Sequence, residues 1–349
     1  MQSLHPIRLA ASLHETIWGG RRLERDGWKQ LPPGNIPIGE SWETEITTVA
    51  QNQPYAGRTL GSLVEELGTR LLGEQVMAMF GCRFPLLAKF LDANDKLSVQ
   101  VHPDDTYARM HEHGKLGKTE FWYVLDAAPG ASIIHGFKAL TSRSEVQQAI
   151  QDTNLEKLLN EVCVSAGDII FVPAGTVHGI GGGVLLYELQ EYSDLTYRMY
   201  DYGRLTAAGT PRELHVKRSL DVSLYDRSTH IKMQPLVLPA GEGFQDRCLA
   251  ACQYFVTREL TFQQSSLFCN YMKRETAGSC SIISSLGAEV IVRYGDTFEY
   301  EEKLVKGQTM VLPATPGNYC IEGNGVLLFS YVPAPGDEIR RLWEAKNGL

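Results

Sequence analysis

The sequence lacks the features that mark several large classes of protein. Its 349 residues carry a formal net charge of −8, so no basic surplus is available to hold a nucleic acid. No apolar run approaches the roughly 20 residues that a membrane helix requires. The opening residues, MQSLHP, show no basic segment followed by an apolar stretch, so we expect no signal peptide. We therefore expect a cytoplasmic protein without a nucleic-acid or membrane partner.

Cysteine is placed too irregularly to indicate a structural framework. The seven cysteines are odd in number and scattered, and Cys248 and Cys252, the closest pair, have no second pair that would complete a zinc knuckle. Free thiols in a reducing cytoplasm are the expected state. The chain is nevertheless too long for one ordinary domain, so we expect two.

Short runs with apolar residues at alternate positions dominate the chain and predict a mainly β fold. They are rich in Val, Ile, Phe and Tyr, a pattern typical of barrels and jelly rolls. The predicted strands are 97–101, 120–125, 131–135, 168–172, 184–189, 289–294, 309–312 and 326–331. A few short helices are predicted by apolar periodicity and by the capping box of Ser142 and Glu145. They span 60–72, 142 to about 159, and 335–347.

One stretch of sequence occurs twice, which predicts two β-rolls. GDIIFVPA at 167–174 is followed after a turn by GVLL, and GQTMVLPA at 307–314 is followed likewise. Five residues beyond each proline stand His178 and Asn318, so only the first copy keeps a metal-binding side chain. We place the boundary near residue 240. Residues 1–240 then form the metal-binding domain, with a helical segment at about 141–161 between strands of its roll. Residues 241–349 form a second roll that lacks metal ligands and ends in a short helix.

Gln100, His102, Glu120 and His178 form a candidate metal site assembled from neighbouring strands. Alternation along a strand places Gln100 and His102 on one face. Glu120 opens an apolar strand, FWYVL, and a buried carboxylate needs a cation. Two imidazoles and a carboxylate suit Zn²⁺ or a similar divalent ion and leave positions open for water or substrate. The alternative for the histidines is two core residues held by hydrogen bonds. Separately, Gln100 is the weaker ligand, and its alternative role is to hold substrate or water.

Charged residues flank these ligands. Lys118 lies two residues before the glutamate and shares its face of a strand, where it would act as acid or base or hold an anionic oxygen. The alternative is a surface lysine. Further along, Glu188, Asp194 and Arg198 would ring a polyhydroxylated substrate. Arg198 and Arg204 would bind phosphate or stabilise an oxyanion. The alternative for this segment is a surface ion-pair network.

Several motifs in one order resemble those of type I mannose-6-phosphate isomerases, in their short bacterial form. The resemblance runs from about residue 6 to the C-terminus, and its motifs are specific only as an ordered set. They are WGG from Trp18, PLLAK ending at Lys89, LSVQVHP from Leu97 to Pro103, KTE from Lys118 to Glu120, PAGTVH ending at His178 and SDLTYR ending at Arg198.

The resemblance implies a cupin fold and a metalloenzyme that acts on a sugar phosphate. It implies one Zn²⁺ per chain, held by the set Gln100, His102, Glu120 and His178. It places Arg198 at the position of the catalytic arginine and Lys118 at that of a lysine in ring opening or proton transfer. The pocket positions that it implies are Trp18, Lys89, Ser98, Glu188 and Asp194. Three features depart from larger relatives: the helical insertion is short, Gly117 stands where some carry a histidine, and the segment LTY before Arg198 differs.

We therefore expect a zinc-dependent aldose–ketose isomerase that interconverts mannose 6-phosphate and fructose 6-phosphate. A proton would move between C1 and C2 through an enediolate. Lys118, Glu188 or metal-bound water would supply acid and base, and Arg198 would stabilise the enediolate charge. Two alternatives stay open: an Fe²⁺-dependent cupin oxygenase, which the same ligands would serve, and a non-catalytic cupin that binds sugar phosphate. A monomer or a homodimer is expected.

Overall fold

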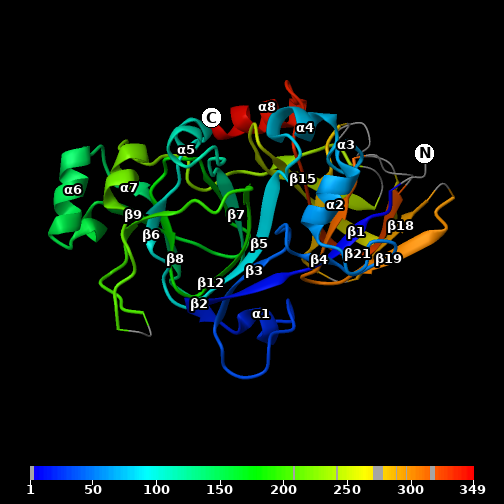
Figure 1. The fold of residues 1–349 in the computed structure, drawn as a ribbon, viewed down its shortest axis with the longest axis horizontal. Coiled ribbons are helices and arrows are strands. Elements are labelled where there is room, and N and C mark those ends of the chain that lie inside the picture. The colour runs from blue at the N-terminus through cyan, green and yellow to red at the C-terminus, as the bar shows by residue number, and fades with distance from the viewer. Residues whose placement is uncertain are drawn as a thin grey trace.

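The chain folds into three antiparallel β-sheets with short helices around them (Figure 1). The computed structural model describes residues 4–206, 209–240, 243–269, 278–287, 289–295, 297–314 and 319–349. The prediction of a mainly β protein is confirmed, and no helix in these ranges is long and apolar enough to cross a membrane. The helices are α1 (Arg22–Arg25), α2 (Leu60–Leu67), α3 (Thr69–Leu72), α4 (Glu74–Phe80), α5 (Asp105–His111), α6 (Arg143–Gln151), α7 (Val216–Val222) and α8 (Glu338–Asn347).

Two of the sheets face each other and form the first β-roll. The six-stranded sheet contains β2 (Ser12–Gly20), β3 (Ile38–Trp42), β5 (Leu86–Ala93), β7 (Glu120–Ala127), β10 (Ile169–Val172) and β12 (Val184–Glu191). The five-stranded sheet contains β6 (Val99–Val101), β8 (Ser132–Phe137), β9 (Leu159–Cys163), β11 (His178–Ile180) and β13 (Tyr197–Tyr200). Their orders are β10-β7-β12-β5-β3-β2 and β13-β6-β11-β8-β9.

The two inner faces of this roll pack together, and the outer faces have different partners. Trp122 of β7 and Ile180 of β11 share one buried cluster, because alternation along each strand turns them inward. On the outer face of the five-stranded sheet, Val99 packs with residues of α6 and α7. Tyr187, on the outer face of the six-stranded sheet, belongs to the core shared with the third sheet. In Figure 1, α6 and α7 therefore lie at one end of the molecule.

The third sheet forms the second β-roll. Its strands are β1 (Ile7–Ala10), β4 (Val49–Ala50), β14 (Leu236–Val237), β15 (Phe244–Ala251), β16 (Val256–Cys269), β17 (Ser281–Ser285), β18 (Val290–Tyr294), β19 (Tyr300–Leu304), β20 (Thr309–Leu312) and β21 (Tyr319–Tyr331). The order is β14-β15-β16-β21-β17-β20-β1-β4, with β18 paired to β21 and β19 paired to β18. β18 and β19 lie at the opposite end of the molecule from α6 and α7 (Figure 1).

N-terminal segments complete this second roll. β1 pairs with β20, and β4 pairs with β1. The carbonyl oxygens of Leu71 and Leu72 accept from the amides of Ala314 and Cys280. Chain from before the predicted boundary near residue 240 therefore contributes to the sheet that lies mostly after it. The division into two domains stays a prediction.

The three predicted helices are all shorter than predicted, and the terminal one, predicted over 335–347, is α8, which begins at Glu338. The capping box is present, since Oγ of Ser142 accepts from the amide of Glu145, but α6 ends at residue 151 rather than near 159. Thr153 has a φ of 57°, a left-handed conformation that a right-handed helix cannot include. The chain then makes a 3₁₀ turn and enters β9. The helix predicted over 60–72 is divided at Gly68, which has a φ of 48°.

Two other expectations concern single residues of the second roll. Asn318, compared above with His178, lies outside the described residues. Cys320 is disulfide-bonded, which corrects the expectation that all thiols are free. Strand pairing places Cys320 opposite Cys269, a relation that sequence spacing does not reveal. Among the side chains that the structure describes, the free cysteines are Cys82, Cys163, Cys248, Cys252 and Cys280.

Candidate active site

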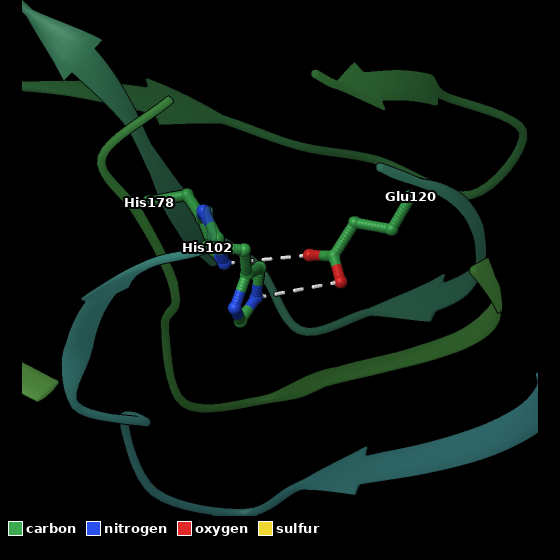
Figure 2. A group of neighbouring side chains, drawn as sticks. All are labelled: His102, Glu120 and His178. Atoms are coloured by element: carbon green, nitrogen blue, oxygen red, sulfur yellow. Dashed lines mark ion pairs between the residues drawn. The ribbon is translucent and has the colours of Figure 1, made fainter. Parts of the chain in front are cut away.

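Three of the predicted metal ligands converge inside the first roll (Figure 2). His102 follows β6, Glu120 opens β7 and His178 opens β11. The ligand atoms of these side chains all lie within 4.8 Å of one another. Nε2 of His102 is 3.6 Å from one carboxylate oxygen of Glu120, and Nε2 of His178 is 3.3 Å from the other. Both imidazoles point toward the carboxylate, which approaches them from the opposite side (Figure 2).

The atoms that meet at this centre are all hydrogen-bond acceptors. Nδ1–H of His102 donates to the carbonyl oxygen of Leu195 at 2.7 Å, and Nδ1–H of His178 donates to that of Thr176 at 2.8 Å. Each ring therefore keeps a lone pair on Nε2. Both Nε2 atoms and Oε1 of Glu120 are buried without a hydrogen-bond partner, and Oε2 of Glu120 has only an ion pair with Lys118. Because unpaired buried acceptors are unfavourable, the three residues fit a divalent cation.

Burial keeps both histidines in the neutral state that metal ligands require. It lowers the pKa of His178 to about 3 and lowers the pKa of His102 well below its usual range, where the charge of Lys118 adds to the effect. Both rings are therefore neutral at pH 7. Burial raises the pKa of Glu120, whereas the ion pair with Lys118, at 2.8 Å, opposes this shift. A bound cation would favour the ionised carboxylate further.

A row of inward side chains extends from this centre across the five-stranded sheet. Gln100 of β6 is in register with His178 of β11 on one side and with Arg198 of β13 on the other. Residues directly opposite one another in an antiparallel pair project from the same face. Gln100 therefore stands between a predicted metal ligand and the predicted catalytic arginine, a position that suits both of its predicted roles.

A second row crosses the six-stranded sheet. Glu188 of β12 is in register with Lys89 of β5 and Trp122 of β7. Nζ of Lys89 is 3.0 Å from the Glu188 carboxylate, and Nε1–H of Trp122 donates to it at 3.0 Å. Burial alone would lower the pKa of Lys89, but Glu188 and Glu40 raise it above its usual value. Burial would raise the pKa of Glu188, but Lys89 and Lys118 lower it. Both groups are therefore charged at pH 7.

A pocket of about 380 Å³ is lined by both rows, a size that suits a small ligand. Lys118 lines it and also pairs with Glu120, so the pocket lies beside the metal ligands. The other predicted site residues that line it are Trp18, Lys89, Ser98, Gln100, Glu188, Asp194 and Arg198. Lining residues that sequence reasoning missed include Glu15, Thr16, Glu40, Trp42, Ser193, Thr196 and Arg212.

Arg204 is the predicted substrate contact that does not line this pocket. Its guanidinium donates to Asp201 and lies 3.6 Å from the carboxylate of Asp95. Arg212, which we did not select from the sequence, lines the pocket instead and donates to the same Asp201. It lies only a few residues beyond the charged segment that ends at Arg204, and this proximity is the signal that could have found it.

Comparison with known proteins connects this site to one enzyme family. Residues 7–122 match the family model described as phosphomannose isomerase type I, catalytic domain. Mannose-6-phosphate isomerase ManA of Bacillus subtilis is 36% identical over 337 residues, which cover 94% of this chain and 99% of the relative. Mannose-6-phosphate isomerase of Streptococcus mutans is 34% identical over 330 residues, which cover 93% of this chain and 98% of the relative.

Solved structures show the same relation. The crystal structure of the mannose 6-phosphate isomerase from Bacillus subtilis aligns with a TM-score of 0.80 and 32% identity, covering 94% of this chain and 99% of that one. A mutant of phosphomannose isomerase from Salmonella typhimurium aligns with a TM-score of 0.72 over 95% of this chain and 100% of that one. At 16% identity, this second likeness concerns the fold alone.

Proposed function

Because the chain belongs to the type I phosphomannose isomerase family, we propose that it interconverts mannose 6-phosphate and fructose 6-phosphate with a bound divalent metal ion. One observation carries the proposal. Buried acceptor atoms of His102, Glu120 and His178 meet beside a pocket that also holds Lys118 and Arg198. Metal ligands alone would fit many proteins, whereas the cationic groups beside them suit a reaction in which negative charge develops on oxygen.

Zn²⁺ is the ion that we propose, one per chain. Two imidazole nitrogens and a carboxylate are the ligands of many catalytic zinc sites, which keep a further position open. When bound, the ion would supply Lewis-acid polarisation of substrate oxygens. Gln100 would make a further contact, either to the metal or to a substrate hydroxyl, because it is in register with His178.

The flanking side chains supply what a proton transfer between C1 and C2 requires. Glu188 is ionised at pH 7, so its carboxylate can accept a proton. The amine of Lys118 lines the pocket and can donate a proton to a substrate oxygen. Arg198 would stabilise the enediolate, because it lines the same pocket and its Nε is buried without a hydrogen-bond partner.

Four further lining residues would hold the sugar. Lys89 stays charged and can donate to a hydroxyl, while Trp18 offers an apolar surface and Ser98 a hydroxyl. Asp194 stands at the exposed edge of the pocket, where its carboxylate pairs with Lys115 at 2.9 Å. We propose contacts to substrate for these four, and none for Arg204, which does not line the pocket.

The test is metal analysis of the purified protein, followed by a coupled assay with mannose 6-phosphate before and after chelation. We expect isomerisation by the metal-loaded protein, loss of activity on chelation and recovery with Zn²⁺. A protein that holds zinc and binds the sugar phosphate without isomerising it would contradict the proposal and indicate a non-catalytic cupin. Bound iron with oxygen uptake would indicate an oxygenase instead.

A further inference from the structure

One end of the pocket has an excess of positive charge, at Arg198 and Arg212. We propose that Arg212 binds the phosphate group of the substrate, and that Asp201 is the residue that positions it. This inference rests on the proposed function, since it names the part of the site that recognises the phosphate of a sugar phosphate. It replaces Arg204, the arginine that the sequence suggested for this role.

Most of the cations that line the pocket already have an anionic partner. The amines of Lys89 and Lys118 each lie within 3.0 Å of a glutamate carboxylate. Arg198 forms no ion pair with any carboxylate in the described part of the chain. Its Nη1 donates to the carbonyl oxygen of Glu213 at 2.9 Å, and its Nε is buried without a partner. A guanidinium with unused donors in a polar pocket fits an anionic ligand.

Asp201 fixes the second guanidinium. Arg212 donates to it from Nε at 2.7 Å and from Nη2 at 2.6 Å, a two-point contact that sets the orientation of the planar group. This leaves Nη1 of Arg212, which has no acceptor among the residues that the structure describes. Arg204 donates to the same carboxylate at 2.6 Å but does not line the pocket. Asp201 is buried, so these contacts are not a surface ion pair.

The charges around Asp201 do not balance. Arg204 and Arg212 form ion pairs with this single buried carboxylate. Arg198 forms none, but the charge of the carboxylate acts on its pKa. Burial lowers the pKa of Arg198, and the charge of Arg212 lowers it further, which reports repulsion between the two guanidinium groups. The other carboxylates nearby, Asp95 and Glu213, have side chains that are 59% and 84% exposed, so water screens their charge. A phosphate monoester carries a charge of roughly −1.5 to −2 at pH 7 and would relieve this repulsion.

The place of Arg212 suits a substrate whose other end lies at the metal. His178, Gln100 and Arg198 form a row across β11, β6 and β13. With strands spaced by about 4.8 Å, the row spans roughly 10 Å. On the free edge of β13, the amide of His215 donates to the carbonyl oxygen of Arg198, so the segment that follows Arg212 continues the row. The phosphate would lie at this end, with the reacting carbons toward the metal.

The experiment compares three variants of the full-length, zinc-loaded enzyme: Arg212→Ala, Arg212→Lys and Arg204→Ala. The readouts are kcat and KM for mannose 6-phosphate and the inhibition constant of inorganic phosphate. Arg212→Ala should raise KM and the inhibition constant by about 10- to 100-fold, with a smaller change in kcat, because a charge-assisted pair to phosphate is lost. Arg212→Lys should fall between it and the wild type, since it keeps the charge but loses the two-point geometry.

Arg204→Ala is the matched control, because Arg204 shares Asp201 but lies outside the pocket lining. Arg204→Ala should raise KM and the inhibition constant of phosphate less than Arg212→Ala does. Equal effects of the two alanine variants, or an inhibition constant within about threefold of the wild type in Arg212→Ala, would overturn the assignment. Zinc content and thermal unfolding of each variant establish that the fold is intact.

A double variant tests Asp201. If Asp201 acts only through Arg212, then Asp201→Asn combined with Arg212→Ala should bind phosphate no more weakly than Arg212→Ala alone. Additive losses would remove Asp201 from the positioning role.

Calorimetric titration with inorganic phosphate separates this inference from the proposed function. Phosphate binding that Arg212→Ala abolishes, in a protein without isomerase activity, would support the phosphate site and contradict the function. Normal isomerisation with unchanged KM in Arg212→Ala would support the proposed function and contradict the phosphate site.

Discussion

Replacing Glu120 by glutamine should separate metal binding from folding. The change keeps the size of the side chain and removes its charge. Both oxygens of Glu120 are buried and face Nε2 atoms that are themselves acceptors. The amide nitrogen of Glu120→Gln can donate to one of these Nε2 atoms, while its oxygen remains available to Lys118. The metal-free variant should therefore still fold, although the buried Lys118 loses its charged partner and the cluster loses the negative charge that attracts a cation.

The magnitude follows from ligand linkage. An ion that binds only the folded state stabilises it by RT ln(1 + [L]/Kd), about 2.7 kcal/mol at a hundredfold excess over Kd. In a chain of this size, 1 kcal/mol corresponds to roughly 2 °C in melting temperature, so Zn²⁺ should raise the Tm of the chelated wild type by about 5 °C. If Glu120→Gln weakens the affinity about 100-fold, the same zinc concentration stabilises the variant by only about 0.4 kcal/mol, or roughly 1 °C.

The assay is thermal unfolding after chelation, with and without added zinc, together with metal content. Glu188→Gln is the matched control, because Glu188 is a buried carboxylate of the same pocket whose partners are Lys89 and Trp122 rather than the histidines. It should keep the full zinc-dependent shift while its turnover falls. A shift in Glu120→Gln as large as that in the wild type, or no shift in the wild type, would refute the assignment of these ligands.

Three further changes test other parts of the molecule. Arg198→Ala should lower kcat by on the order of 10² with zinc content unchanged, and unaltered turnover would exclude Arg198 from the mechanism. Arg258→Met removes the partner of Asp246 from a fully buried ion pair and should lower the free energy of unfolding in urea by about 3 kcal/mol; a loss below about 1 kcal/mol would contradict this. Burial lowers the pKa of His135, so the unfolded chain gains a proton near pH 6.5 that the folded chain does not. The free energy of unfolding of the zinc-loaded protein should therefore fall between pH 7 and 5, by up to about 1.4 kcal/mol per pH unit for this residue, and His135→Gln should reduce the slope. A slope that the substitution leaves unchanged would show that His135 is not its source.

The residues of the candidate metal site were predictable because each has a local signal in the sequence. Glu120 interrupts an apolar strand, His178 follows a turn with proline and glycine, and His102 alternates with Gln100. Alternation and turn chemistry depend on neighbouring residues, which the sequence displays directly. The same local rules predicted strands that overlap β6, β7, β10 and β12. They also predicted where α6 begins, from its capping box.

Features that depend on strand pairing could not be read in this way. Lys89 and Glu188 are far apart in the sequence and meet because β5 and β12 are neighbours in a sheet. Arg212 is oriented by Asp201, which is shared with Arg204, and no periodicity distinguishes the arginine that lines the pocket from the one that does not. The pairing of β1 with β20 joins the two ends of the chain for the same kind of reason. Register across distant strands is a property of the packed core.

The second roll contributes to the site by position rather than by ligands. The cluster of possible metal ligands found among the described residues lies wholly in the first roll. Yet Tyr254, between β15 and β16, donates to Asp105 at 3.1 Å, and Asp105 accepts from the amide of Gly117 at 2.8 Å. The amide that follows Lys118 donates to the buried Glu191 at 2.7 Å. The backbone is thus held on both sides of Lys118, and one of these contacts leads to the second roll. A proton transfer requires heavy atoms at hydrogen-bond distance. If Lys118 has its proposed role, we therefore expect the second roll to affect catalysis without touching substrate.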